Sequence, residues 1–289
     1  MIIDADTKLY CLIGNPISKS LSPLIHNYIF KFNSINAKYL AFNINSNYAL
    51  EKAICGFKAL EIKGFNVTMP FKIEIMKYLD EIDEKAKILG AVNTVLNIDG
   101  KLIGYNTDGD GFIKSLKNKN IYLRDKKVAI IGAGGVAHSI AVSLCYEGIK
   151  ELIIINRNQH NAHVLQRLIV DKFSDIDIKS YGFEEKAMIS KDIELLVNAT
   201  PVGMYPNLED IPISPSIFTT KTIFYDTIYK PYKTRLVLEA EKLGHKSMGG
   251  LDMLVNQAIY SQEIWNKGMF DENTDWSYIK DLIVGKVKD

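Results

Sequence analysis

A glycine-rich turn near the middle of the chain is the stretch best suited to hold a phosphate. The apolar run Val128–Ile131 predicts a buried parallel strand, and the apolar spacing that follows the turn predicts a helix. Glycines in such a turn let the backbone bend sharply and approach a pyrophosphate, which then lies against the free N–H groups of the helix start. The sequence therefore predicts a dinucleotide site, with an ordinary tight turn as the alternative. Its residues are Gly132, Ala133, Gly134, Gly135, Val136 and Ala137.

The end of the next predicted strand bears on which dinucleotide is bound. Glu151–Ile155 is followed by Asn156, Arg157 and Asn158, with no acid among them. In NAD-binding folds an acid at this place holds the adenosine ribose, whereas a basic residue accommodates a 2′-phosphate. Arginine pairs with a phosphate through several N–H donors, so we expect NADP. Arg157 as an ordinary surface residue is the alternative.

A serine-rich loop near the N-terminus precedes a predicted helix. Ser22 followed by Pro23 predicts an N-cap and a first helical residue. With Ser20 and Ser18, these hydroxyls form either a polar loop with one cap or a site for a small carboxylate at the helix start.

Further polar side chains follow a predicted strand at residues 64–68. Asn66, Thr68 and Lys72 lie at or just past its end, where open α/β sheets place their ligands. A lone lysine is more often a surface charge. Asp108 leads into a helix expected at 112–116, which it could merely cap.

These residues are carried by alternating strand and helix patterns, which predict an α/β fold. In the first half, a hairpin signal at Asp99-Gly100 interrupts the alternation, the charged segment 80–87 is expected to be a solvated helix, and 114–127 a solvated basic connector. A doubly wound cofactor domain is expected from Lys127 to about Gly249. The predicted strands span 9–13, 39–44, 64–68, 95–98, 102–105, 127–131, 151–155, 176–179, 194–198 and 222–226. The predicted helices include 50–60 and an apolar stripe from Leu251 to Trp265 that contains Gln257.

Composition excludes several classes of protein. The 289 residues carry a formal charge of +1, and 47% are hydrophobic, as expected of a globular protein without a field that recruits nucleic acid or membrane. No apolar run approaches the ~20 residues of a membrane span. With Asp4 and Asp6 in place of the basic start of a signal peptide, we expect a cytoplasmic protein.

Neither the cysteines nor the histidines predict a metal site. Cys11, Cys55 and Cys145 are odd in number and widely spaced, which favours reduced buried thiols over disulfides or zinc. His160 and His163 have helical i, i+3 spacing but no third ligand nearby in the sequence, which favours surface histidines.

Several separated segments together resemble the shikimate dehydrogenase family. They are GNPISKSLSPLIHN, NVTMPFK, GAVNT, GYNTDG, GAGG, NATPVGM, DTIYKPYKT and GGLDMLVNQA, and they follow the family's order over nearly the whole chain. The resemblance implies reversible, NADPH-dependent reduction of 3-dehydroshikimate to shikimate, a step of aromatic amino-acid biosynthesis.

The resemblance also implies a domain organisation. Residues 1–108 and 250–289 would form a substrate-binding α/β domain with a returning C-terminal helical segment, and residues 109–249 a Rossmann domain, as a monomer or homodimer. The site would lie in the cleft between them.

The family's roles fall on matching positions of this chain. Lys72 and Asp108 would be the catalytic pair, with Lys72 as acid/base. Substrate would be held by Ser20, Ser22, Asn66, Thr68, Lys72, Asn93, Asp108, Tyr229 and Gln257. Cofactor would be held by the glycine turn, by Asn156, Arg157 and Asn158, and by Thr200, Met204, Thr227 and Gly250.

The sequence departs from the family at the cofactor. Asn158 and Asn161 stand where many NADP-using members carry a threonine and a second arginine, and His138 where relatives often have arginine. Relaxed use of NAD is therefore compatible with the sequence. The rivals are a quinate or dual-specificity dehydrogenase and a noncatalytic dinucleotide sensor. Ser20, Ser22 and Thr68 favour shikimate over quinate, and Lys72 with Asp108 argues against a sensor.

Overall fold

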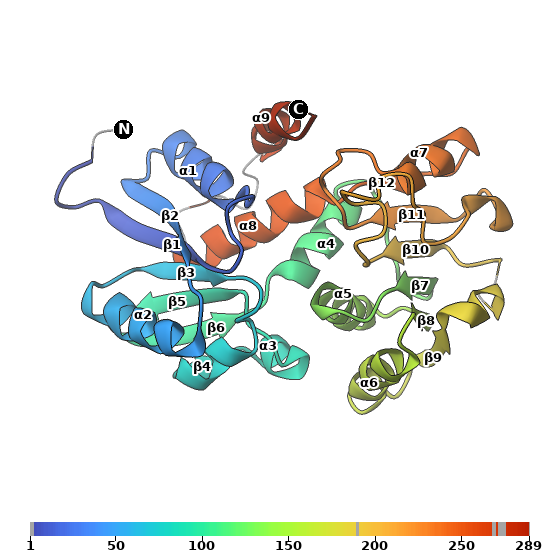
Figure 1. Ribbon diagram of the computed structural model, residues 1–289, viewed down its shortest axis with the longest axis horizontal. Helices are drawn as coiled ribbons and strands as arrows, with labels where there is room; N and C mark the ends of the chain where they lie inside the picture. Colours follow the sequence, from blue (N-terminus) through green and yellow to red (C-terminus); the bar gives the residue numbers. More distant parts are fainter. Residues whose placement is uncertain (1–2, 189–190, 268–269, 271–275, 289) are drawn as a thin grey trace. The chain divides into compact units, whose positions relative to one another are not determined.

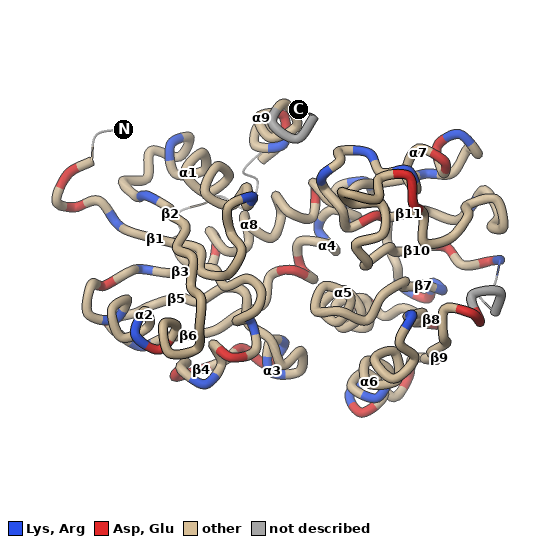
Figure 2. Tube along the Cα trace, viewed as in Figure 1, with Lys and Arg blue, Asp and Glu red and all other residues tan. Residues whose placement is uncertain are grey.

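The computed structural model describes residues 3–188, 191–267, 270 and 276–288. The chain divides into two compact units, each of which is described by itself. The first comprises Met1–Thr107 and Gln257–Ile279, and the second Asp108–Asn256 and Lys280–Asp289. Within each unit Lys and Arg are interspersed with Asp and Glu along the chain (Figure 2).

The first unit is built on a mixed sheet. Its strand order is β2-β1-β3-β5-β6-β4, in which β1 pairs in parallel with β2 and β3, and the hairpin β5–β6 runs antiparallel. Strand β4 pairs in parallel with β6, so β5 alone runs opposite to the other five strands of this six-stranded sheet. The elements are β1 Lys8–Gly14, α1 Ser22–Phe32, β2 Ala37–Asn43, α2 Asn47–Ala59, β3 Gly64–Val67, η1 Glu74–Tyr78, β4 Glu81–Ile82, α3 Glu84–Leu89, β5 Thr94–Ile98 and β6 Lys101–Tyr105.

Alternate residues of β1 face opposite sides of this sheet, because side chains alternate along a strand. Cys11 and Ile13 pack in a core with α2, and Tyr10 and Leu12 pack in another with residues of α1 and with Trp265. Figure 1 shows α2 on one side of the sheet and α1 and α8 on the other. Helix α8 is Leu251–Trp265. The sheet is therefore covered on both faces.

The second unit is a doubly wound parallel sheet, as expected. Its order is β12-β11-β10-β7-β8-β9, and each neighbouring pair of these described strands is parallel. The order reverses between β10 and β7, the place where such sheets bind ligands at the carboxyl ends of their strands. The elements are α4 Asp108–Lys117, β7 Lys127–Ile131, α5 Gly135–Tyr146, β8 Glu151–Asn156, α6 Gln159–Val170, β9 Asp177–Gly182, η2 Phe183–Met188, β10 Leu195–Asn198, η3 Pro215–Ile217, β11 Ile223–Asp226, α7 Arg235–Lys242 and β12 Ser247–Met248.

Helices also cover both faces of this second sheet. Val128 and Ile130 pack with residues of α4, α5 and α6, whereas Ala129 and Ile131 pack with residues of α7. Figure 1 shows α5 and α6 on the face opposite α7. This continuous burial explains why the strands read as uninterrupted apolar runs.

Three sequence-based expectations were wrong. The charged segment 80–87 is not one helix, because the short strand β4 pairs with β6 before α3 begins at Glu84. The basic stretch 114–127 is not a single connector, since its two ends belong to α4 and β7. The cysteines are all free, but Cys55 is exposed, because it lies on the outer face of α2.

Candidate functional site

The expected site residues are divided between the two units. Ser20, Ser22, Asn66, Thr68, Lys72, Asn93 and Gln257 belong to the first unit, whereas Asp108, Tyr229 and every expected cofactor residue belong to the second.

The serine loop brings two hydroxyls together at the start of α1. Ser20 Oγ lies 3.2 Å from Ser22 Oγ and accepts a hydrogen bond from the Ser22 backbone N–H at 3.2 Å. The expectation that Ser22 is the N-cap was wrong, because the cap residue is Leu21 and no side chain caps the helix. Both serines are half-buried. Their hydroxyls and the positive end of α1 therefore suit a carboxylate.

Asn66 lies on β3 in a buried polar network and is 6% exposed. Its side-chain oxygen accepts a hydrogen bond from the Tyr39 hydroxyl at 2.7 Å. Its amide donates to the Asn93 carbonyl at 3.1 Å and to the hydroxyls of Thr94 and Ser261 at 3.0 and 3.1 Å. Asn66 is thus fixed by its neighbours in the first unit.

Thr68 and Lys72 lie on the turn that follows β3. The Thr68 N–H donates to the Ile13 carbonyl at 2.9 Å, which extends the strand pairing by one residue. The Lys72 carbonyl accepts from the Val92 N–H at 2.8 Å, and the lysine is half-buried. The turn is therefore held against the segment that leads to Asn93.

Asn93 in turn holds the chain that leads into α4. Its side-chain oxygen accepts from the Thr107 N–H at 2.9 Å, and its amide donates to the Thr107 hydroxyl at 3.1 Å. Asp108 follows directly as the first residue of α4, where a carboxylate interacts favourably with the helix dipole. Lys72, Asn93 and Asp108 are thus on, or directly after, segments joined by hydrogen bonds within the first unit.

Tyr229 and Gln257 complete the expected substrate set. Burial raises the pKa of the Tyr229 hydroxyl, which keeps it a neutral hydrogen-bond donor. Gln257 is half-buried on α8, and its backbone carbonyl accepts a hydrogen bond from the Ser261 hydroxyl at 3.0 Å.

The glycine turn has the form expected of a dinucleotide site. Gly132 has φ +115°, and a Cβ there would stand 2.8 Å from the Ala199 carbonyl oxygen. A Cβ on Gly134 or Gly135 would meet nothing within 4 Å, and no side chain caps α5. Exposed backbone N–H groups at a helix start with space in front of them fit a pyrophosphate. Val136 is exposed and Ala137 is fully buried, as helix packing requires.

The segment after β8 is exposed, and its two asparagine side chains form hydrogen bonds within the segment and to the start of α6. The Asn156 amide donates to the Asn158 carbonyl at 2.9 Å, and the Asn158 side chain caps α6 by accepting from the His160 N–H at 3.0 Å. Arg157 between them is exposed. It is therefore the cation available for a ribose phosphate at this place.

A buried carboxylate joins the loops after β10 and β11. Asp226 is fully buried and accepts hydrogen bonds from the Asn198 amide at 3.1 Å and the Thr234 hydroxyl at 2.6 Å. Asn198 also accepts from the Thr200 hydroxyl at 2.6 Å. Burial raises the pKa of Asp226, and the hydrogen bonds that the carboxylate accepts offset only part of that effect. The carboxylate thereby fixes the segment that bears Thr200.

The remaining expected cofactor residues lie on these same loops. Thr227 donates its N–H to the Asn198 carbonyl at 3.0 Å, and Gly250 donates to the Ile228 carbonyl at 3.0 Å. A Cβ on Gly250 would stand 2.0 Å from the Thr227 carbonyl oxygen, so only glycine fits. Met204 is 45% exposed.

Sequence reasoning missed the residues that hold these side chains. Thr94 and Thr107 stand inside the quoted motifs GAVNT and GYNTDG, so they could have been selected as polar residues beside a predicted ligand-binding one. Asp226 and Thr234 are likewise the first and last residues of the quoted motif DTIYKPYKT. Tyr39 and Ser261 lie outside every quoted motif and carry no local signal.

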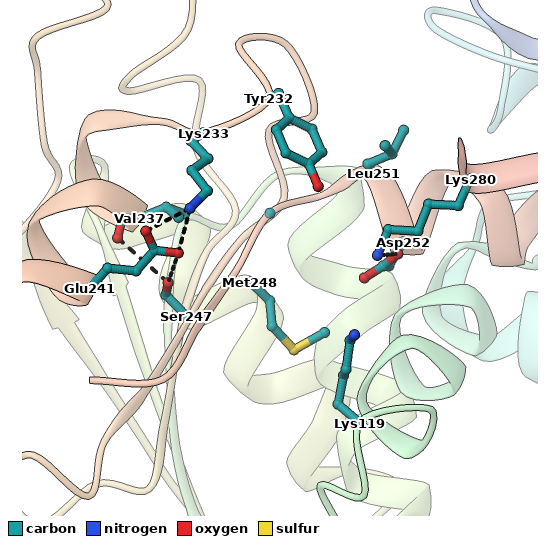
Figure 3. A pocket seen from close by; sticks show the side chains of 11 residues that line it. Lys119, Tyr232, Lys233, Val237, Glu241, Ser247, Met248, Leu251, Asp252 and Lys280 are labelled. Atoms are coloured by element: carbon teal, nitrogen blue, oxygen red, sulfur yellow. Dashed lines mark hydrogen bonds and ion pairs between the residues drawn. The ribbon is translucent and has the colours of Figure 1, made fainter. Parts of the chain in front are cut away.

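A cavity of about 170 Å³ in the second unit is lined by none of the expected site residues, although Gly249 and Leu251, on either side of Gly250 in the sequence, line it (Figure 3). Two of its lysines are paired, Lys233 with Glu241 at 2.7 Å and Lys280 with Asp252 at 2.6 Å.

Among the described residues, no group of three or more His, Cys, Asp and Glu could hold a metal ion. Nor is any described helix long and apolar enough to cross a membrane.

Comparison with known proteins identifies the family. A model of the shikimate dehydrogenase substrate-binding domain matches residues 12–95, and one of shikimate / quinate 5-dehydrogenases matches residues 115–202. A curated shikimate dehydrogenase (NADP+) of Caldanaerobacter subterraneus subsp. tengcongensis is 42% identical over 281 residues, or 97% of this chain and 99% of the relative.

Two solved structures share the fold over 97% or more of the chain. Shikimate 5-dehydrogenase from Listeria monocytogenes, in complex with shikimate and NAD, has a TM-score of 0.91 and 36% identity, and the match covers 97% of this chain and 98% of that one. A shikimate dehydrogenase in complex with NADP+ has a TM-score of 0.91 and 38% identity, and the match covers 100% of this chain and 98% of that one. The chain belongs to the shikimate dehydrogenase family.

Proposed function

We propose that this protein catalyses the reversible, NADPH-dependent reduction of 3-dehydroshikimate to shikimate in aromatic amino-acid biosynthesis. The observation that carries the proposal is the 42% identity to a shikimate dehydrogenase (NADP+) over 97% of the chain. The first unit is the substrate-binding domain and the second unit is the cofactor domain.

The residues present fit NADP. The uncapped start of α5, with open space before Gly134 and Gly135, would receive the pyrophosphate, and the exposed Arg157 would pair with the 2′-phosphate. When bound, the reduced cofactor supplies the hydride that the carbonyl carbon of the substrate accepts. Asn156, Asn158, Thr200, Met204, Thr227 and Gly250 would complete the contacts.

Lys72 would be the acid of the reduction. As negative charge grows on the carbonyl oxygen, an ammonium group beside it stabilises that charge and donates its proton, which yields the alcohol. In the reverse direction the neutral amine takes the same proton from the hydroxyl. The bond from the Val92 N–H to the Lys72 carbonyl supports this role, because it fixes the backbone from which the ammonium extends.

Asp108 would be the partner of Lys72 and would bind an adjacent ring hydroxyl. The two hydrogen bonds between Asn93 and Thr107 support this, since they fix the residue before Asp108.

Ser20, Ser22 and Tyr229 would bind the substrate carboxylate with neutral hydroxyl donors. Thr68, Asn93 and Gln257 would bind ring hydroxyls. For Asn66, the hydrogen bonds to Tyr39, Thr94 and Ser261 support an orienting role within this set. The reaction is proposed to take place in the cytoplasm, in a monomer or homodimer.

An assay by nicotinamide absorbance tests this function. The purified protein is offered shikimate and quinate, each with NADP+ and with NAD+. We expect the highest kcat/KM for shikimate with NADP+. A higher kcat/KM for quinate would reassign the substrate, and no turnover in any combination would leave only the noncatalytic sensor.

A further inference from the structure

Ser261 is a fully buried hydroxyl on α8, one helical turn after Gln257. Its Oγ lies 3.1 Å from the Asn66 amide nitrogen, 2.9 Å from Thr94 Oγ1 and 3.4 Å from Thr107 Oγ1. It also lies 3.0 Å from the Gln257 carbonyl oxygen. A single atom thus joins α8, β3, β5 and the segment before Asp108.

The protons available to this cluster limit its arrangement. A serine hydroxyl donates one hydrogen bond and accepts up to two. The Asn66 amide can only donate to Ser261, so the Ser261 proton points to Gln257 O or to a threonine oxygen. Thr94 likewise has one proton, which serves either Asn93 Oδ1 at 2.9 Å or Ser261. The hydroxyls therefore constrain one another and reach the side chain of Asn93 and the backbone carbonyl of Gln257.

We propose that Ser261 is a positioning residue for the substrate site. It fixes the turn of α8 that carries Gln257 against strand β3, which carries Asn66, and against Thr94 at the start of β5, the residue after Asn93. It touches no expected reacting atom, and it acts through Asn66, Thr94 and the backbone of Gln257, which support the side chains assigned above to bind ring hydroxyls. The inference rests on the proposed function, because those assignments do.

When the Ser261 hydroxyl is removed, its neighbours Asn66 and Thr94 keep other hydrogen-bond partners. The Asn66 amide keeps the Asn93 carbonyl and the Thr94 hydroxyl as acceptors, and Thr94 keeps Asn93 Oδ1. The fold should therefore tolerate Ser261→Ala, while the tie between α8 and the strands is lost. The side chains that bind the ring hydroxyls contact the substrate and the transition state equally. When their placement is less exact, KM rises with little change in kcat.

Steady-state kinetics of Ser261→Ala and Thr94→Val test the proposal. Valine removes the threonine hydroxyl and keeps its shape. We expect each variant to raise KM for shikimate about tenfold, with kcat and KM for NADP+ within about twofold of the parent. The effects of the double variant should be less than additive, because the Ser261–Thr94 contact is lost in both single variants.

Ser115→Ala is the matched control. Ser115 is also buried on a helix, and its hydroxyl lies 2.8 Å from the Tyr225 hydroxyl in the second unit. Both alanine variants should lower Tm by about 2 °C, but only Ser261→Ala should raise KM for shikimate. A folded Ser261→Ala with an unchanged KM would overturn the positioning role, as would additive effects with Thr94→Val. Absence of turnover in the parent would overturn the proposed function itself.

Discussion

The Thr107 backbone N–H donates a 2.9 Å hydrogen bond to the side-chain oxygen of Asn93, and both residues are buried. The same Asn93 amide donates to the Thr107 hydroxyl. A side chain that is expected to meet substrate is therefore also the support of the chain leading into Asp108. Binding and the placement of a catalytic group depend on one amide.

Removing the proposed acid should lower kcat by more than it raises KM. We expect Lys72→Met to lower kcat by about 10²–10⁴, the range of general acid–base catalysis, because methionine keeps the stem and loses the proton donor. Asp108→Asn should lower kcat less, since the ammonium remains. The measurement is steady-state turnover of shikimate with NADP+.

Lys77→Met is the matched control for this pair. Lys77 is an exposed lysine of the same unit that pairs with Glu74 at 2.8 Å. Its replacement should leave kcat unchanged. Near-normal kcat in both Lys72→Met and Asp108→Asn would remove the pair from the chemistry.

Local sequence patterns predict the strands and turns of the fold more completely than they predict the residues that support the site. Buried strands such as Val128–Ile131 and the Asp99-Gly100 turn are encoded by adjacent residues, and the structure has them. Strand β4 was missed because two residues among charged neighbours carry no periodicity. The supports of the site were missed because Tyr39, Asn66 and Ser261 meet only in three dimensions.

Gly64→Ala should destabilise the first unit strongly. A Cβ there would stand 2.4 Å from Trp265 Nε1, which donates to the Val95 carbonyl at 2.9 Å. The indole must move and lose that bond, so the free energy of unfolding should fall by about 3 kcal/mol. Urea unfolding measures it. Gly56→Ala is the control, because its Cβ would meet nothing within 4 Å and alanine favours the helix by about 1 kcal/mol. Equal effects of the two would contradict the packing argument.

His26 should make the fold less stable in mild acid. Burial lowers its pKa to about 3 from 6.5, and its ring stacks on Tyr39 at 4.3 Å. Between these pH values the unfolded chain binds the proton and the folded chain does not. The contribution to stability is therefore complete above pH 6.5 and is lost as the pH falls toward 3, by about 1.4 kcal/mol per unit.

NMR and unfolding measurements check this pH dependence. The His26 ring C–H resonances should not titrate between pH 8 and pH 5. His26→Gln should flatten the decline of unfolding free energy between pH 6.5 and pH 5. A resonance midpoint near 6.5 would contradict the buried neutral ring.

Asp226 should tolerate loss of its charge but not loss of its oxygens. Asp226→Ala removes the acceptor of the Thr234 hydroxyl and of the Ile228 N–H, and one of the two acceptors of the Asn198 amide, so the free energy of unfolding should fall by about 2–4 kcal/mol. Asp226→Asn keeps one oxygen and should cost less than about 1.5 kcal/mol, since burial already disfavours the charge. Guanidinium unfolding at pH 7 compares them. A larger loss in the asparagine variant would show that the charge itself stabilises the loops.

Arg157→Ser should reduce the preference for NADP. Arg157 is the exposed cation after β8, and its neighbour Asn158 is occupied in capping α6. A charge-assisted contact to the 2′-phosphate is worth about 1.5–3 kcal/mol, so KM for NADP+ should rise by about 10–100-fold. KM for NAD+, which lacks that phosphate, should stay within about twofold. Arg167→Ser removes another exposed arginine, on α6, and should change neither value. An equal rise for both cofactors would assign Arg157 to the shape of the loop instead of to the phosphate.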